Sequence, residues 1–496
     1  MSEQPLAKQL DSLTEQLLYL LPEGLLVLTL VVVLLLNIVR RGRATRAYGW
    51  LTLGGTLLAM AGLFILPGDH QLQAFGRLFL VDEHSNFVRG MALLGLFLAV
   101  LLSLQIRRRN YGRQAEHYGL LLGLTLGAMF LGSSTHLLMV YLSLETLSLS
   151  AYLATHLRGD RGSAESSFKY LLFGALSSAM LLYSLSWVYG VTGTLYPLEP
   201  GFWEALNSLP LAGQVVLALG VTFGIAFKIS AAPAHLWAPD VYETAPLPTV
   251  ALFSVVPKIA AATLLLRIGL TLGGETSSPY WEVVWPILIS ATLLVGNLGA
   301  IRQAKAMRLM AYSSIAHSGF LLLAVLAINS AGAVPFRTYS LVYLLMNFAA
   351  FGLIKRLIFH TGTDEMSQWK GWGKFLPAIG IFLVVVMVAL VGLPPTAGFF
   401  AKLITLSAIF AMAESAHHWV GIAGLIGLFS TVVALFYYLK IPYFLFFQKS
   451  ESFAIKSQAI TYREMLVGLL TILLLIGFFQ SDLLLWGIEL ITKTSH

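Results

Sequence analysis

The sequence predicts an all-α polytopic membrane protein with about 14 transmembrane helices. Of its 496 residues, 57% are hydrophobic and only 11% are charged, and the mean hydropathy is +0.79. A water-soluble core cannot bury so much apolar surface. Crossing the hydrocarbon takes about 20 apolar residues in a helix, and most of the chain divides into segments of that length between short polar stretches.

The expected helices follow one another with little room for a soluble domain. The first apolar run, 25–39, follows an acidic leader and lacks the basic region and the small-residue cleavage site of a signal peptide, so it predicts a retained helix. The fourteen segments lie at about 22–40, 48–67, 87–106, 117–133, 135–156, 167–191, 210–232, 241–268, 282–301, 308–329, 337–359, 376–411, 419–445 and 463–490.

Proline interrupts the seventh and the twelfth of these segments. The seventh reads GIAFKISAAP at 224–233, and the twelfth reads VGLPPTAG at 391–398. Proline removes a backbone donor and clashes with the preceding turn, so both helices are expected to break near bilayer depth. Because the breaks lie five helices apart, we expect two inverted five-helix repeats, helices 4–8 and 9–13, with broken helices 7 and 12. The predicted units are residues 1–113 with three helices, 114–270 with the first repeat, 271–447 with the second repeat and 448–496 with a final helix.

Basic residues alternate between the two sides of the predicted membrane. Of the 31 Lys and Arg residues, 22 fall in the odd-numbered connections between helices and three fall inside apolar segments. The even-numbered connections and the termini hold the other six, which are Lys8, Arg77, Arg89, Arg267, Arg337 and Lys493. Because basic residues hold loops on the cytoplasmic side, we expect both termini on the outer, periplasmic side.

The composition also excludes several kinds of chemistry. The chain has no cysteine, which excludes disulfides, thiolate zinc sites and cysteine-ligated iron-sulfur clusters. No glycine-rich dinucleotide motif stands in a strand-turn-helix context. The net charge of +7 follows from the basic loops rather than from a nucleic-acid surface. We therefore expect no cofactor or metal in this chain and no nucleic-acid partner.

Four ionisable residues stand inside apolar segments. Glu145 lies near the centre of the fifth, Lys228 lies five residues before Pro233 in the seventh, Lys258 lies in the eighth, and Lys402 follows the break of the twelfth. An ionised group there costs at least a few kcal/mol unless it finds a partner, a cavity or a proton. Burial also disfavours the charged form of a lysine, which lets that lysine exchange protons. We therefore predict proton transfer among these residues; structural pairing, or lysines that reach to the interface, is the plainer alternative.

Further polar residues extend this set. Lys169, near the start of the sixth helix, is placed either to reach the buried glutamate or to close a cytoplasmic loop. His317 lies mid-helix, and imidazole changes its charge near neutral pH, which suits a relay. Tyr343 and Asn347 are spaced i to i+4 and are expected to line a wet channel with it. His235, beside the seventh-helix break, has the same two interpretations as His317, a proton relay or a hydrogen-bonded packing group.

Electrostatic coupling among such groups is strong enough to pass a signal. Two unit charges about 8 Å apart at an effective dielectric near 20 interact by roughly 2 kcal/mol. Moving one proton against 100 mV takes about 2.3 kcal/mol. If a conformational change separates Glu145 from a lysine partner, that lysine releases its proton more readily. A chain of lysines can therefore be coupled by charge alone.

Three runs of sequence resemble the antiporter-like membrane subunits of respiratory complex I. They are FKISAAPAHLWAPDVYETAPLP at 227–248, LMAYSSIAH at 309–317 and GLPPTAGFFAK at 392–402. The PDVYE run at 239–243 is similar to the subunit N group rather than to subunits L or M. Lys402 agrees with this, because subunit M is expected to have glutamate at that place.

The resemblance implies a proton channel within a proton-translocating NADH:quinone oxidoreductase, driven by quinone reduction elsewhere in the complex. It implies roles in proton translocation for Glu145, Lys169, Lys228, Lys258 and Lys402. It also implies that the partners are neighbouring membrane-arm subunits in the bacterial cytoplasmic (inner) membrane. NADH, FMN, iron-sulfur clusters and quinone are then expected in partner subunits, and this chain would be a non-redox part of the enzyme.

Three other functions are compatible with the same features. A cation/proton antiporter subunit of the Mrp type shares the fold and the charged residues, although the PDVYE run argues against it. An independent solute transporter would place its substrate site at the two broken helices, but the intramembrane groups here are mainly titratable. A structural scaffold would keep its function when Lys228 or Glu145 is replaced.

Overall fold

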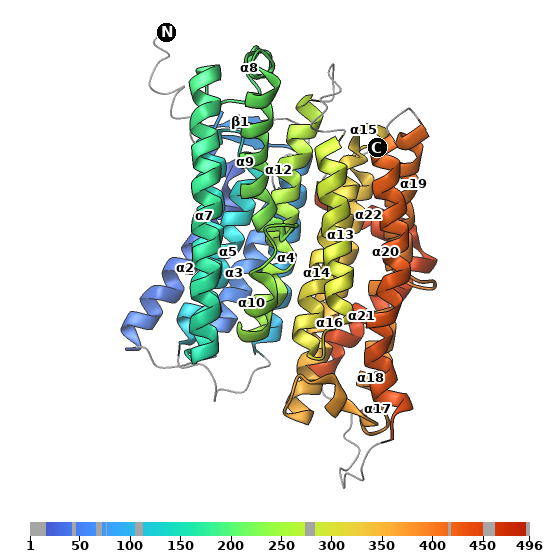
Figure 1. The fold of residues 1–496 in the computed structure, drawn as a ribbon. Helices are drawn as coiled ribbons and strands as arrows, with labels where there is room; N and C mark the ends of the chain where they lie inside the picture. The colour runs from blue at the N-terminus through green and yellow to red at the C-terminus, as the bar shows by residue number, and fades with distance from the viewer. Residues whose placement is uncertain are drawn as a thin grey trace.

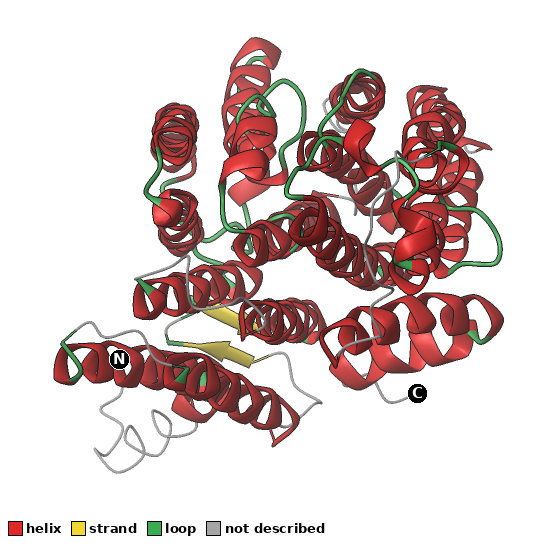
Figure 2. Cartoon of the chain, turned by 90° about the horizontal axis from the view of Figure 1, so that it is seen from below, coloured by secondary structure: helices red, strands yellow, loops and turns green. Residues whose placement is uncertain are grey.

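The computed structural model describes residues 16–41, 46–65, 72–75, 77–104, 113–272, 283–414, 418–449 and 462–492. Long helices run side by side, with the N-terminal half of the chain beside the C-terminal half (Figure 1). We call the end that carries β1, α8 and α15 the outer end and the end that carries α10 and α17 the inner end, as the predicted orientation has them. Seen along the helix axes, most helices are viewed end-on, and the small sheet lies among the N-terminal helices (Figure 2).

The N-terminal half holds most of the first eight expected segments. Its strands pair antiparallel, with Gln73 opposite Leu80. Its elements are α2 (Leu21–Val39), α3 (Ala47–Ile65), β1 (Leu72–Ala74), β2 (Phe79–Val81), α4 (Glu83–Leu104), α5 (Gln114–Ser133), α6 (Leu137–Thr155), η1 (His156–Arg158), α7 (Arg161–Thr192), α8 (Phe202–Asn207), α9 (Leu211–Ile229), α10 (Ala238–Thr244), α11 (Leu247–Phe253) and α12 (Val256–Leu272).

The C-terminal half is also helical throughout its described residues. Its elements are α13 (Trp285–Ile301), α14 (Ala306–Leu326), α15 (Ile328–Ala331), α16 (Val334–Thr361), η3 (Met366–Trp369), α17 (Trp372–Phe375), α18 (Pro377–Val391), α19 (Ala397–Glu414), α20 (His418–Pro442), η4 (Tyr443–Phe447), α21 (Tyr462–Phe479) and α22 (Ser481–Thr492). Every one of the fourteen expected segments therefore contains at least one helix.

The predicted class, an all-α polytopic membrane protein, is confirmed. Within the described residues, 11 helices are long and apolar enough to cross a membrane, or 12 if the bent pair α21 and α22 is one span. The apolar helices α13 and α18 are shorter than such a span. The exact number of fourteen and the inverted repeats stay predictions. The basic residues at 43, 107–109 and 456 and both chain ends, with Lys8 and Lys493, lie outside the described residues.

Local sequence sets where the long helices begin and end. The Asp160 carboxylate accepts a hydrogen bond of 2.7 Å from the Ser163 amide and caps the start of α7. Gly193 ends the same helix in the left-handed region, with φ of 69°, and donates to the Tyr189 carbonyl. These two caps bound a helix of 32 residues, which is long enough to cross the bilayer and extend past it.

Both expected breaks are present. Helix α9 ends at Ile229, and Ser230 follows with φ of 60°, so the chain leaves the helix before Pro233 and resumes helical geometry only in α10. Helix α18 ends at Val391, and Gly392 takes φ of 84° before α19 begins. Glycine adopts that conformation without strain. Each break leaves the last carbonyl groups of the first half-helix without helical partners.

Two expected segments were wrong in detail. The segment 241–268 is not one helix, because Pro246 and Pro248 cannot continue α10; the chain instead starts α11 and then α12. The segment 463–490 is not one helix either. It divides at Gln480 into α21 and α22, which meet at 109°, and Asp482 in the first turn of α22 favours a new helix start there.

Glycine lets neighbouring helices approach closely, and two such contacts involve α6 and α14. A Cβ on Gly127 of α5 would lie 2.7 Å from the Leu147 backbone nitrogen of α6. A Cβ on Gly296 of α13 would lie 2.4 Å from the Ala316 backbone nitrogen of α14. Helices in a bilayer associate mainly through such packing, because lipid is as apolar as their own side chains. These contacts fix α6 and α14, the helices that carry much of the buried polar chemistry.

A buried ion pair joins α2 to α4. Arg89 Nε donates to Glu23 Oε1 over 2.6 Å, and both side chains are almost fully buried. Arg89 also contacts Asn86 Oδ1 at 3.5 Å. The sequence pattern had assigned Arg89 to the outer connections, whereas the structure places it inside the bundle. The pair ties the first helix to the rest of the protein.

Removing one member of this pair will destabilise the protein strongly. We expect Arg89→Leu to cost about 3 to 5 kcal/mol, because it leaves the Glu23 carboxylate buried without its partner. Adding Glu23→Leu to that variant should recover most of the loss. Thermal unfolding in detergent measures both effects. Arg77→Ala is the control, because its contact with Glu199 is exposed and should contribute less than about 1 kcal/mol.

Candidate functional site

A line of buried polar groups begins at α6 and α7. Glu145 is half-buried on α6 and accepts a hydrogen bond from the Ser178 hydroxyl of α7. Ser148 lies one helical turn after Glu145 and accepts a hydrogen bond from Lys228 Nζ. Glu145 and Lys228 are therefore linked through one face of α6.

Lys228 stands at the end of the first half of the broken seventh segment. It is 5% exposed, and its ammonium lies 5.0 Å from the Phe227 ring centroid and 5.8 Å from that of Tyr152. The next carbonyl, that of Ile229, has no helical partner because α9 ends there, and it accepts a 2.6 Å hydrogen bond from Ser318. The helix break thus connects Lys228 to the neighbouring helix α14.

Lys258 is the centre of the line. Its side chain is fully buried, and Nζ donates to the Ser314 carbonyl at 2.8 Å, the Ser314 hydroxyl at 2.6 Å and the Ser318 hydroxyl at 2.9 Å. An ammonium has three protons, and all three acceptors come from one turn of α14. The Ser314 hydroxyl also contacts the hydroxyl groups of Tyr343 and Tyr242, each at 2.9 Å.

His317 continues the polar groups beyond Tyr343. Its ring stacks on Tyr343 with centroids 4.9 Å apart. Nδ1 lies 2.6 Å from the Tyr339 hydroxyl, and Nε2 lies 3.1 Å from the Tyr438 hydroxyl. The Tyr438 hydroxyl in turn contacts Ser313. Because both ring nitrogens have hydroxyl partners, the imidazole can take a proton on one side and release one on the other.

Lys402 lies at the second helix break. It is 5% exposed, and Nζ donates to the carbonyls of Val391 at 2.7 Å and Leu390 at 3.3 Å. These are carbonyls at the end of α18, where the helix leaves such groups unpaired. The ammonium also lies 4.5 Å from the Phe320 ring centroid, and Phe320 stacks on Tyr339, which contacts His317. The carbonyl groups that the break leaves unpaired therefore bind the Lys402 ammonium directly.

Two predicted residues, Lys169 and His235, lie apart from this line. Lys169 pairs with Glu165 at 2.7 Å and Asp240 at 3.3 Å and is half-exposed, so the structure places it at the inner end and not with Glu145. Ser178, which does contact Glu145, lies nine residues further along α7, about 13 Å away. His235 is half-buried at the first break, and its Nδ1 has no hydrogen-bond partner within the described residues.

Asn347 is buried on α16, one turn after Tyr343. Its Nδ2 has no hydrogen-bond partner in the described part of the chain. Tyr343 therefore contacts the line directly, through the Ser314 hydroxyl. Asn347 lies beside the line, one turn further along α16. Sequence reasoning did not identify the serines 148, 314 and 318. The signal was available, because Ser314 and Ser318 repeat at i to i+4 on the same helix as His317.

A cluster of charges closes the inner end, and we call it the inner clamp (Lys169, Asp240, Glu243, Lys305 and Arg308). Arg308 Nη1 contacts Asp240 Oδ1 and Glu243 Oε2, each at 3.0 Å. Lys305 Nζ donates to Glu243 Oε1 at 2.5 Å. The clamp ties α10, which follows the first break, to α7 and to the start of α14. The PDVYE run that carried the family resemblance supplies both carboxylates.

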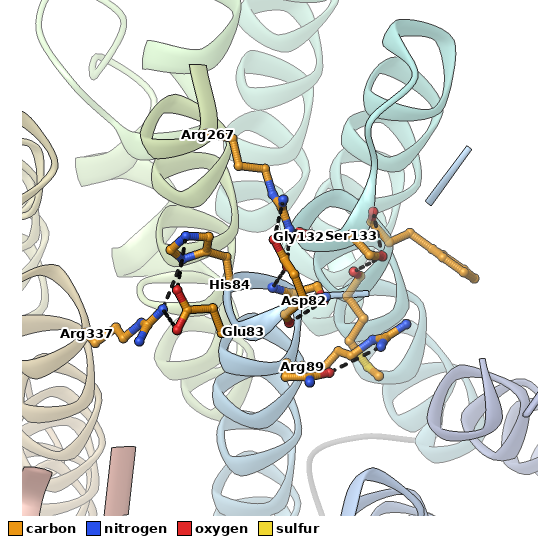
Figure 3. A network of polar contacts seen from close by, with 12 residues as sticks. Asp82, Glu83, His84, Arg89, Gly132, Ser133, Arg267 and Arg337 are labelled. Carbon is orange, nitrogen blue, oxygen red and sulfur yellow. Dashed lines mark hydrogen bonds and ion pairs between the residues drawn. The ribbon is translucent and has the colours of Figure 1, made fainter. Parts of the chain in front are cut away.

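A second cluster occupies the outer end, and we call it the outer network (Asp82, Glu83, His84, Arg267 and Arg337; Figure 3). Arg267 binds Asp82 through two hydrogen bonds of 2.6 and 2.8 Å and donates to the Gly132 carbonyl at 3.0 Å. Burial raises the pKa of the Asp82 carboxyl, but the charge and hydrogen bonds of Arg267 outweigh burial and hold that pKa below 3.8. Asp82 therefore stays ionised and holds α12 against α4.

A profile described as NADH:quinone oxidoreductase/Mrp antiporter, TM matches residues 134–432, more than half of the chain. The chain belongs to this family. The match contains the three runs at 227–248, 309–317 and 392–402, so the resemblance inferred from those runs is confirmed.

Relatives of this antiporter-like family agree on the subunit type. NAD(P)H-quinone oxidoreductase subunit 2 from Nostoc sp. is 35% identical over 440 residues, which cover 88% of this chain and 82% of that protein. NADH-quinone oxidoreductase subunit N from Chlorobium chlorochromatii is 34% identical over 438 residues, 86% of this chain and 84% of that protein. A chain of respiratory complex I from Thermus thermophilus matches with a TM-score of 0.76 and 31% identity, covering 95% of this chain and 98% of that chain.

The inner clamp predicts a defined dependence of stability on pH. Burial raises the pKa of the Glu243 carboxyl, but its hydrogen bonds and ion pairs with Lys305 and Arg308 outweigh burial and keep the pKa below 4.5. A lowered carboxyl pKa stabilises the fold above the unfolded-state value, and this stabilisation is lost as the pH falls through the folded-state value.

We therefore expect Glu243→Gln to lower the melting temperature at pH 7 by an amount that reflects about 1 kcal/mol or more. The difference between the variant and the natural chain should shrink as the pH falls below 4.5 and disappear once the pH is below the lowered folded-state pKa of Glu243. Thermal unfolding in detergent across this pH range measures it. Glu414→Gln is the control, since Glu414 is exposed at the end of α19. A difference that persists unchanged at pH 3 would contradict the ion-pair explanation.

Proposed function

We propose that this chain is a proton-translocating membrane subunit of an NADH:quinone oxidoreductase of the complex I type. The observation that carries the proposal is the line of buried polar groups across the bundle, joined in part by hydrogen bonds and in part by ring stacking. It runs from Glu145 past Lys228 to Lys258 and His317, and three lysines are held in a membrane interior on hydroxyl and carbonyl groups. Such groups in a membrane are costly, and they commonly mark a route for ions or protons.

The chemistry follows from the kind of partner each lysine has. Lys258 is bound by Ser314 and Ser318, whose hydroxyl groups both donate and accept hydrogen bonds. A proton that leaves Lys258 can therefore pass to a hydroxyl, while the hydroxyl proton moves on to the next acceptor. Tyr343 and His317 stand next in line for such a transfer. After it, Lys258 is neutral and ready to accept a proton again.

The charge of Glu145 can couple proton transfer among the lysines to a conformational change that begins elsewhere in the complex. When Glu145 is ionised near Lys228, it favours the charged lysine, and at a separation of about 8 Å the interaction is roughly 2 kcal/mol. A conformational change that moves Glu145 away removes this stabilisation. Lys228 then gives up its proton more easily, and the charge change acts on Lys258. This interaction energy is similar to the roughly 2.3 kcal/mol that moving one proton against 100 mV requires.

The roles of the individual residues follow from these positions. Glu145, Lys228, Lys258, His317 and Lys402 carry or control the proton. Tyr343 is a direct relay, and Asn347 and His235 support the wet surroundings. We assign Lys169 to the inner clamp, where it holds α10 in place. The two broken helices would stand in two inverted repeats, residues 114–270 and 271–447, flanked by residues 1–113 and 448–496.

The proposal also places the chain within its complex. As a non-redox subunit in a bacterial cytoplasmic (inner) membrane, with both termini on the outer side, it would contact neighbouring membrane-arm subunits and lipid. NADH, FMN, iron-sulfur clusters and quinone would be bound by other subunits. A cation/proton antiporter subunit of the Mrp type is the second candidate, because the family profile covers both groups. Sodium flux by the isolated chain, without a redox partner, would favour that candidate.

Replacing Lys258 tests whether it exchanges protons or only supplies charge. Arginine keeps the positive charge but does not release its proton. We expect Lys258→Arg and Lys258→Met both to slow proton transfer by about 100-fold or more, whereas a purely structural cation would be rescued by arginine. Lys258→His, which can titrate, should retain part of the activity. NADH-driven acidification of membrane vesicles that contain the assembled complex measures these rates.

Two controls accompany this experiment. Lys374→Met replaces an exposed lysine at the inner end and should leave proton pumping unchanged. Assembly of each variant is checked by co-purification with the other subunits, so that loss of pumping is separated from loss of the complex. Normal pumping by assembled Lys258→Arg complexes would reject the proton-exchange role of Lys258.

A further inference from the structure

One face of α16 joins the buried lysine line to the outer network. Arg337, Ser340, Tyr343 and Asn347 follow one another at spacings of three or four residues, so they lie on the same side of the helix. All four are buried, with at most 7% of each residue exposed. At 1.5 Å per residue they extend over about 15 Å of the helix axis. We call these four residues the polar face of α16.

The polar face contacts the proton-bearing groups at Tyr343. The Tyr343 hydroxyl lies 2.9 Å from the Ser314 hydroxyl, which accepts a hydrogen bond from Lys258 Nζ at 2.6 Å. It also donates to the Ser254 carbonyl at 3.2 Å. A single hydroxyl group therefore separates Lys258 from α16, and a proton that leaves Lys258 can reach Tyr343 in two transfers.

The other end of the polar face reaches the surface. Arg337 Nη2 lies 3.0 Å from Glu83 Oε2 and 3.2 Å from His84 Nδ1, both at the start of α4 (Figure 3). The Glu83 side chain is 43% exposed, whereas that of Arg337 is 9% exposed. The carboxylate of Glu83 is thus in contact with the outer medium and with a buried group of the polar face at the same time.

Between these ends, polar atoms are left without partners. The Ser340 hydroxyl is fully buried and has no hydrogen-bond partner among the residues that the structure describes, and the same holds for Arg337 Nε and Asn347 Nδ2. Serine and threonine in a helix usually bond back to the carbonyl four residues earlier, as Thr263 and Thr405 do here. Ser340 does not, so its hydroxyl is available to another partner.

Water is the partner that fits these atoms. Folded proteins rarely leave buried polar groups unpaired, and buried water molecules commonly satisfy them. Ser340 lies one turn from Tyr343 and one turn from Arg337, so water at Ser340 would bridge the gap between the lysine line and the outer network. Thr338 also has an unpaired buried hydroxyl, but it lies two residues from Ser340 and so on a different side of α16.

We propose that the polar face of α16 is the proton outlet of this chain, carrying protons from Lys258 through Tyr343, Ser340 and ordered water to Glu83 and His84 at the outer surface. The inference rests on the proposed function. In each transfer one O–H or N–H bond breaks and another forms, and no electrons move. Arg337 places a fixed positive charge at the mouth, which raises the electrostatic barrier to other cations, while Glu83 accepts the outgoing proton and releases it to bulk water.

Access of water to Ser340 is tested directly by chemical labelling. The chain has no cysteine, so Ser340→Cys and Thr338→Cys each give this chain a single thiol within the assembled complex. Silver ion is small enough to follow a water path, and it reacts with an accessible thiol. Membranes are treated from the outer side or the inner side, denatured and labelled with a maleimide, and the labelled fraction of this chain is measured by mass spectrometry.

We expect Ser340→Cys to be blocked from the outer side about tenfold or more faster than Thr338→Cys. Equal rates for the two thiols, or faster reaction of Ser340→Cys from the inner side, would overturn the outlet. This readout does not depend on proton pumping. It therefore tests the path even if the function proposed for the lysines is wrong.

The transport role is tested with Ser340→Val, which removes the hydroxyl and fills the space beside it. We expect fewer protons to be released per NADH oxidised, whereas the matched variant Thr338→Val pumps normally. Normal pumping by assembled Ser340→Val complexes would reject the outlet alone. Normal pumping by Lys258→Arg complexes would instead reject the proposed function, so the two failures are distinguishable.

Discussion

The arrangement of this protein depends on giving each buried ammonium group enough acceptors inside a membrane. A lysine that loses water must find other oxygen atoms. Lys402 uses the Leu390 and Val391 carbonyls, which are available because α18 ends there. Lys258 uses the hydroxyl and carbonyl oxygens of Ser314 and the hydroxyl of Ser318. Carbonyl groups left unpaired at a helix break and the oxygen atoms of serines are thus two sources of acceptors for a buried ammonium group.

The ion pairs that stabilise the fold lie apart from the lysines that are proposed to carry protons. The carboxylates of Asp240, Glu243 and Asp82 form short pairs with Arg308, Lys305 and Arg267 at the two ends of the bundle. Among the described residues, no carboxylate pairs within 4.0 Å with the central lysines. A tight ion pair would hold a lysine in its charged form. In the proposed mechanism, the neutral hydroxyl and carbonyl partners of the central lysines leave the proton free to move, while the ion pairs tie α10 to α7 and α14 at the inner end and α12 to α4 at the outer end.

The same division explains how a distant event can act on the line. Helix α10 is fixed to α14 and α7 by the inner clamp, and α4 is fixed to α12 and α16 by the outer network. Between them, Glu145 is half-buried, and within the described part of the chain its side chain accepts one hydrogen bond, from the Ser178 hydroxyl. It is the group in the line that a small movement of α6 or α7 would shift most easily. In the proposed mechanism its charge then acts on Lys228, with an interaction of roughly 2 kcal/mol at a separation of about 8 Å.

The sequence by itself determined the membrane class, the two helix breaks, the buried lysines and the family. The first three follow from local properties, since apolar length, proline position and the cost of burying a charge are read along one segment. The family follows from the resemblance of the runs at 227–248, 309–317 and 392–402 to known members. Only the tertiary structure decided the pairings. Lys228 meets Ser148 across 80 residues of sequence, Arg267 meets Asp82 across 185, and Lys169 meets Asp240 instead of Glu145. Helices in lipid gain little from apolar contact alone, so small-residue packing and hydrogen bonds between distant segments choose their neighbours.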